Sequence, residues 1–231
     1  MIKWTIDDNV ISELYYQGKN IINPWGFETA DSSAFFSLEK GVGWRYEKLE
    51  EEYIYDELSY KAHVLTKMLE GEWKLNIDDS IEKNCIIRRV EAITLKDSFF
   101  MDFVLRYRFK KEFIEYAEIN NTKFYHKNTN VYYQFPVDNI FLKGKGFDIT
   151  LSIIDSIVSD KMNPVMYIRD SKDEWVVHVR MIPKKWDKEV IKICTRWAGT
   201  RPLPQRIATT LLKWNWLKKQ LWYRGEREPY R

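Results

Sequence analysis

Several features that define common protein classes are missing from this chain of 231 residues. It contains no run of about 18 apolar residues, so no segment predicts a membrane-spanning helix. Residues 1–10 include Asp7 and Asp8 and hold no apolar stretch, which argues against a secretory signal. We therefore expect a cytoplasmic protein that is at most peripheral to a membrane.

The motifs of several enzyme classes are also absent. Gly41-Val42-Gly43-Trp44 lacks the third glycine of a dinucleotide-binding turn, and the chain has neither a P-loop nor the Gly-x-Ser-x-Gly turn of serine hydrolases. Its two cysteines have no metal-ligand spacing, and its three histidines lie far apart in sequence. We expect neither a metal nor another cofactor.

Apolar and polar residues alternate along several segments of the chain. In residues 101–110, five apolar side chains alternate with polar or charged ones, apart from Val104. Successive side chains of a strand point to opposite faces, so this period predicts a half-buried strand. Residues 131–137 and 175–182 repeat the pattern, and Asn- or Gly-rich turns separate the runs. The sequence predicts a mainly β fold, an antiparallel β-sandwich over residues 1–183.

Other segments give weaker signals. Residues 8–16 predict one or two amphipathic helical turns, and 46–69 is ambiguous between helix and strand, with strand preferred. Turns are expected at Asn23-Pro24-Trp25-Gly26 and Asn163-Pro164, with Trp25 as a core residue. The strand that begins near Trp73 is expected to end at Asp78-Asp79-Ser80.

The C-terminal segment differs in charge and composition. Residues 184–231 hold 13 Lys or Arg and 4 Asp or Glu, a net charge of +9, while the remainder is −6. Apolar spacing predicts helices over 187–197 and 205–223, the second amphipathic and rich in Trp. Such a helix either packs on the acidic body or docks on an anionic membrane or a protein partner; nucleic acid is a less favoured partner.

The polar face of the predicted sheet carries the candidate site. If the alternating strands are neighbours, their polar side chains share one surface, where arginine forks suit carboxylates or phosphates. The proton-transfer candidates are Asp102, Tyr132 and His178, and the ligand-binding candidates are Arg106, Arg108, Gln134 and Arg180. The alternative is that these are ordinary solvent-facing sheet residues with cross-strand ion pairs.

Two functions follow from these features. The first is recognition or processing of an acidic sugar or glycan through the polar sheet face, with binding and catalysis left as alternatives. The long aromatic-rich strands are similar, in general shape only, to those of large carbohydrate-active β-sandwich proteins. The second is a non-enzymatic interaction protein that docks through its basic C-terminal helix.

Overall fold

The computed structural model describes residues 1–8, 10–30, 35–37, 47–68, 71–96, 102–119, 121–126, 131–137, 139–158 and 162–183. It is mainly β, and its sheets are antiparallel, as the alternation predicted. The chain divides into two compact units, Met1–Phe100 and Met101–Arg231. The predicted boundary at residues 183 and 184 remains a prediction, and the two predicted C-terminal helices and Gly41–Trp44 lie outside the described residues.

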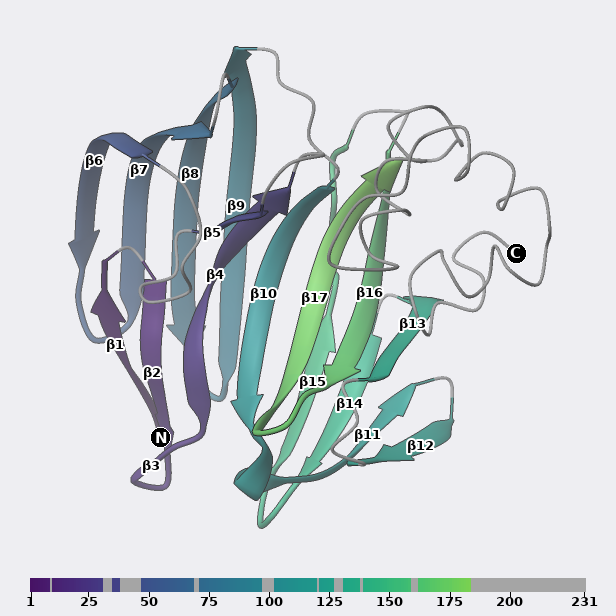
Figure 1. The fold of residues 1–231 in the computed structure, drawn as a ribbon. Helices are drawn as coiled ribbons and strands as arrows, with labels where there is room; N and C mark the ends of the chain where they lie inside the picture. Colours follow the sequence, from purple (N-terminus) through teal and green to yellow (C-terminus); the bar gives the residue numbers. More distant parts are fainter. Residues whose placement is uncertain are drawn as a thin grey trace, which may run out of the picture. The chain divides into compact units, whose positions relative to one another are not determined.

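Unit 1 is built from nine strands in the described residues (Figure 1). They are β1 (Ile2–Asp7), β2 (Val10–Tyr16), β3 (Lys19–Asn20), β4 (Ile22–Ala30), β5 (Phe35–Ser37), β6 (Glu47–Tyr55), β7 (Ser59–Met68), β8 (Gly71–Glu82) and β9 (Cys85–Lys96). One sheet has the order β1-β2-β3 and another the order β6-β7-β8-β9, while β4 pairs with β5.

The helix predicted over 8–16 is wrong, because β2 occupies that stretch. Val10, Ile11 and Leu14 are buried and follow a helix-like spacing, but the segment pairs with β1 along its length. The turn into β3 has positive φ at Gln17 and Gly18, the geometry of a tight β-hairpin. The ladder with β1 therefore overrides the local pattern.

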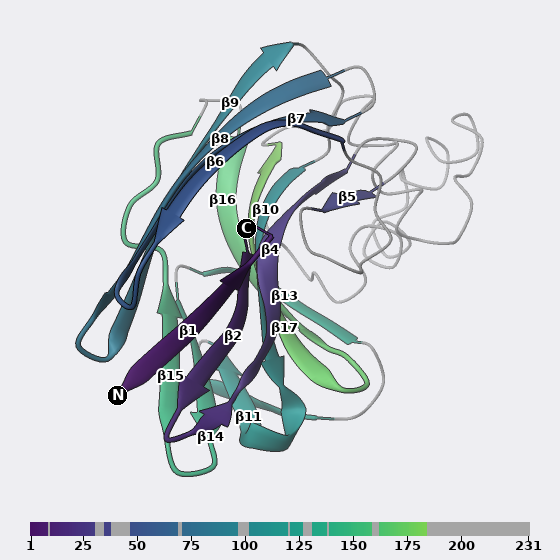
Figure 2. The ribbon, with the colours of Figure 1, turned by 90° about the vertical axis from the view of Figure 1, so that its left-hand side faces the viewer.

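The four long strands β6 to β9 lie side by side in Figure 2. The strand preference for 46–69 is confirmed by β6 and β7, which a short turn at 56–58 connects. In β8, buried and less buried residues alternate from Gly71 to Glu82. The predicted end at Asp78-Asp79-Ser80 is wrong, because β8 continues through these residues and Asp79 is fully buried.

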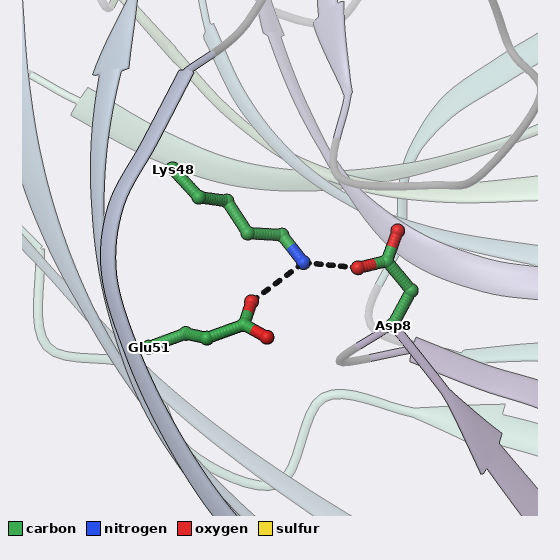
Figure 3. A network of polar contacts seen from close by, with 3 residues as sticks. All are labelled: Asp8, Lys48 and Glu51. Carbon is green, nitrogen blue, oxygen red and sulfur yellow. Dashed lines mark hydrogen bonds and ion pairs between the residues drawn. The ribbon is translucent and has the colours of Figure 1, made fainter.

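Side-chain contacts join the two layers of unit 1. Trp4 Nε1 of β1 donates a hydrogen bond to the Asp56 carbonyl oxygen, 3.1 Å away, at the end of β6. Lys48 of β6 forms ion pairs with Asp8 and with Glu51 (Figure 3). Arg88 of β9 lies 5.2 Å from the centre of the Phe27 ring of β4. The inner face of β7 and β8 supplies the core between these layers.

Unit 2 contains eight strands and one short 3-10 helix in its described part. They are β10 (Asp102–Lys110), η1 (Lys111–Phe113), β11 (Ile114–Ile119), β12 (Thr122–Tyr125), β13 (Val131–Val137), β14 (Asn139–Gly144), β15 (Asp148–Ser152), β16 (Met162–Asp170) and β17 (Glu174–Pro183). The neighbours run β13-β16-β17-β10 in one sheet and β12-β11-β14-β15 in the other. The predicted strands 101–110, 131–137 and 175–182 correspond to β10, β13 and β17.

Both predicted Asn-Pro turns are wrong, since Pro24 lies in β4 and Pro164 in β16. For Pro164 the reason is visible in the pairing. The ladder between β13 and β16 ends at Met166, so at Pro164 the strand pairs only with β17 among the described residues. A proline that lacks an N–H is tolerated there. Trp25 is a core residue as predicted, with 5% of its surface exposed.

Candidate functional site: an arginine-lined sheet face

The register of unit 2 makes neighbours of the strands that carry the candidate residues. Arg106 of β10 lies opposite His178 of β17, and His178 lies opposite Tyr167 of β16. In the next row, Arg108, Val176 and Arg169 are aligned across the same three strands. We call this surface, which carries Arg106, Arg108, Arg169, His178 and Arg180, the arginine face.

The remaining predicted residues occupy register positions on the same side of the sheet. Tyr132 is opposite Arg169, and Gln134 is opposite Tyr167. Asp102 precedes Val104, which is opposite Arg180, by two positions along β10. Of the three predicted strands, β10 and β17 are neighbours, whereas β16 lies between β13 and β17. The side chains of Asp102, Tyr132 and Gln134 lie outside the described part.

The arginine face is buried, and this is a correction to the solvent-facing alternative. Arg180 has 0% of its surface exposed, His178 3% and Arg106 8%. Arg108 and Arg169 are half-buried and form the more exposed end of the face. Burial of this many cationic groups is costly unless each has polar partners. One of these partners is visible, since Arg108 Nε donates to Glu174 Oε2 at 2.9 Å.

His178 lies at the centre of the cationic cluster. Burial lowers its pKa well below the usual value of 6.5, and the charges of Arg106, Arg169, Arg180 and Arg108 lower it further. Both causes act in the same direction, because each disfavours the imidazolium. The side chain is therefore neutral at pH 7, and its ring can donate or accept a hydrogen bond with a ligand.

Sequence reasoning missed Arg169 and Glu174. Arg169 lies in β16, and the sequence could not give the place of this strand between β13 and β17. Glu174 lies just before the predicted strand 175–182; in the structure it begins β17 and is 7% exposed.

The opposite face of this sheet meets the second sheet of unit 2. His126, which follows β12, contacts the buried carboxylate of Asp170 through Nδ1. Its ring also lies edge-on to Trp175, with 6.0 Å between ring centres. Phe109, Val177 and other apolar residues complete this face. The arginine face therefore points away from the inter-sheet core of its own unit.

A second buried polar cluster lies in unit 1. Arg88 Nε donates to Asp79 Oδ2 at 2.9 Å, and Tyr60 occupies the neighbouring position on β7. Burial raises the pKa of Asp79, and Arg88 opposes this effect. Burial also raises the pKa of Tyr60. This cluster holds the layers together and, unlike the arginine face, has no concentration of one charge.

No three His, Cys, Asp or Glu side chains come together as metal ligands in the described residues. In the same part of the chain, no helix has the length and apolarity needed to cross a bilayer. No family model, curated protein or solved structure matches the chain.

Proposed function

We propose that unit 2 binds an acidic sugar or glycan through the arginine face. The observation that supports this proposal is the convergence of four arginines around one neutral histidine on three adjacent strands. A guanidinium offers a planar fork of N–H donors that matches a carboxylate in two-point fashion. The register positions of Tyr132 and Gln134 on the same face add groups that suit sugar hydroxyls.

The face also offers a gradient of exposure that suits ligand entry. Arg108 and Arg169 are half-buried, whereas Arg180 is fully buried. An anion that first meets the exposed end gains attraction as it moves into the less polar interior, where charges interact more strongly. If the ligand is processed, Asp102, Tyr132 and His178 are the candidates for proton transfer, and the surrounding arginines make His178 a weak base.

The experiment is a thermal-shift titration with glucuronate and galacturonate, with glucose and galactose as neutral counterparts. A ligand that binds only the folded state raises the melting temperature by mass action. We expect uronic acids to raise it and the neutral sugars to leave it unchanged. Equal shifts from acidic and neutral sugars, or no shift with either uronic acid, would contradict the proposal.

Arg106→Lys is the informative variant because it keeps the charge and removes the fork. We expect its dissociation constant for the uronic acid to rise by about tenfold, which corresponds to about 1.4 kcal/mol. Arg89→Lys, at an exposed position of β9, is the matched control and should bind as the wild type does. Unchanged binding by Arg106→Lys, in a protein with wild-type melting temperature, would remove the arginine face from the site.

A further inference from the structure

The strand β6 forms one edge of the sheet β6-β7-β8-β9 (Figure 1). Among the described residues its only ladder partner is β7. Three consecutive residues near its end have large exposed side chains: Tyr53 with 44% of its surface exposed, Ile54 with 72% and Tyr55 with 53%. An exposed edge strand of this length is a template for pairing with another chain.

The second half of β6 lacks the strongest of the features that protect an edge. Edges are commonly blocked by proline, by a bulge or by charged side chains, lysine above all. In β6 the single bulge lies between Lys48 and Glu50, and the ladder with β7 is regular from Glu50 to Tyr55. That regular stretch contains neither proline nor lysine.

The hairpin geometry shows which backbone groups face the edge. Asp56 N donates to the Ser59 oxygen at 2.9 Å, so Asp56 and Ser59 form a hydrogen-bonded pair. Bonded and non-bonded pairs alternate in an antiparallel ladder. Tyr55 opposite Tyr60 and Tyr53 opposite Ala62 are therefore non-bonded pairs. The N–H and C=O groups of Tyr53 and Tyr55 point away from β7.

Both ends of β6 are held in place. At its C-terminal end, the Asp56 carboxylate accepts hydrogen bonds from the N–H groups of Leu58 and Ser59, each at 2.7 Å. At its N-terminal end, Lys48 is ion-paired with Asp8 and Glu51 (Figure 3). A strand ordered in advance loses less conformational entropy when a partner binds.

The two faces of the edge differ in chemistry. Glu50, Glu52 and the exposed Ile54 lie on one face, and Glu51 lies with Tyr53 and Tyr55 on the other, where the two tyrosine rings stack with their centres 6.3 Å apart. We propose that this edge binds an extended basic segment of a partner protein by strand addition. In the added strand, Lys or Arg side chains face the two glutamates, and apolar side chains pack on the tyrosines. A second copy of β6 added in parallel and in register would bring like glutamates together, which disfavours that arrangement.

The test uses two synthetic peptides of the same length as β6, which has 9 residues. In one, lysine alternates with valine; in the other, glutamate replaces lysine. Binding to the full chain is followed by fluorescence anisotropy of the labelled peptides. We expect the cationic peptide to bind and the anionic peptide to bind at least about tenfold more weakly.

Tyr53→Pro tests the edge itself. The Tyr53 N–H points away from β7, so a proline there breaks no bond of the β6–β7 ladder but blocks an added strand. We expect it to weaken binding of the cationic peptide by at least about tenfold, while Tyr53→Val, which keeps the N–H, binds within about threefold of wild type. Far-UV circular dichroism checks that both variants fold. Glu50→Lys with Glu52→Lys should reverse the peptide preference.

Three results would overturn the proposal. The first is equal binding of both peptides, or binding of neither. The second is a folded Tyr53→Pro variant with wild-type affinity, which would place the binding elsewhere. The third is self-association of the wild type that Tyr53→Pro abolishes in sedimentation experiments, which would assign the edge to a second copy of the chain.

Discussion

Arg88 and Asp79 lie directly opposite each other on β9 and β8, and Arg88 Nε donates to Asp79 Oδ2 at 2.9 Å. Their side chains are 3% and 0% exposed. Burial raises the pKa of Asp79 even though Arg88 favours its ionised form. By its geometry the pair is a buried salt bridge inside the core of unit 1, and Arg88 also lies over the Phe27 ring of β4.

Asp79→Asn should destabilise the protein by about 3–5 kcal/mol, because it leaves the Arg88 charge buried without its carboxylate. The double variant Asp79→Leu with Arg88→Met should recover most of this loss, since an apolar pair replaces the charges. Urea denaturation measures the free energy of unfolding of each variant. If the double variant is as unstable as the single one, then an apolar pair cannot replace the ion pair, and the two side chains stabilise the fold by more than neutralising each other's charge.

The neighbouring residue supplies a matched control. Asp78 points to the outer face of β8, where its carboxylate lies 3.7 Å from Lys61 Nζ, with side-chain exposures of 48% and 56%. Asp78→Asn should change stability by no more than about 0.5 kcal/mol. A loss similar to that of Asp79→Asn would contradict the assignment of the two carboxylates to opposite environments.

Asp79 also shows where sequence reasoning stopped. Two adjacent acids and a serine are typical of a turn, so the strand was predicted to end there. The hairpin at Lys83 and Asn84 makes Glu82 the partner of Cys85, and the same register pairs Asp79 with Arg88. Local composition could not distinguish a turn at these residues from a strand that continues through them. The position of the hairpin turn, and not the acids themselves, determines which residue lies opposite Asp79.

The arginine face, too, could be predicted only in part from the sequence. Alternation along residues 101–110 and 175–182 gave the face of each residue, because the period of a strand is fixed. It could not give strand order, and the pairing of Arg106 with His178 joins residues 72 positions apart. The burial of this face was not predicted for a related reason: a sheet face with polar side chains is expected to be exposed to solvent.

The turn after β6 depends on one carboxylate. Hydrogen bonds from Leu58 N and Ser59 N, followed by the Ser59 hydroxyl, lower the pKa of Asp56 below its usual value of 3.8. As the pH falls, Asp56 is therefore protonated in the unfolded chain before it is protonated in the folded protein. Its contribution to the free energy of unfolding is complete above pH 3.8 and is lost as the pH falls through the pKa of the folded state. Asp56→Asn keeps an oxygen acceptor and should remove this acid-dependent loss, as measured by urea midpoints between about pH 5 and 2.5.

Asp56→Ala serves as the companion variant. It removes the acceptor for both amides, so its urea midpoint should be lower than those of wild type and Asp56→Asn at pH 7. If the urea midpoints of wild type and Asp56→Asn fall equally as the pH is lowered, then other carboxylates cause the loss of stability in acid.

His178 predicts a loss of stability in weak acid. Its folded pKa lies well below 6.5, so between 6.5 and that value the unfolded chain binds a proton that the folded protein does not. Stability therefore falls as the pH drops below 6.5, by at most about 1.4 kcal/mol per pH unit for one proton. In His178→Gln this slope should be smaller, as determined by urea unfolding from pH 7.5 to about 5.

Gly144, at the end of β14, and Gly146, in the turn that follows, require glycine for different physical reasons. A Cβ on Gly144 would lie 2.6 Å from the Phe147 carbonyl oxygen and 2.8 Å from its ring. That oxygen also accepts the Gly144 N–H at 2.8 Å, so the turn must open to admit a side chain. We expect Gly144→Ala to cost about 3 kcal/mol or more.

Gly146 has open space around its Cβ position but a φ of +91°. Gly146→Ala should cost only about 1–2 kcal/mol, the penalty of a left-handed conformation. Gly146→Asn should cost less, since asparagine tolerates positive φ. Urea unfolding of the three variants checks this order. If Gly146→Ala is the more damaging change, then backbone conformation, and not the close approach of Phe147, is what requires glycine in this turn.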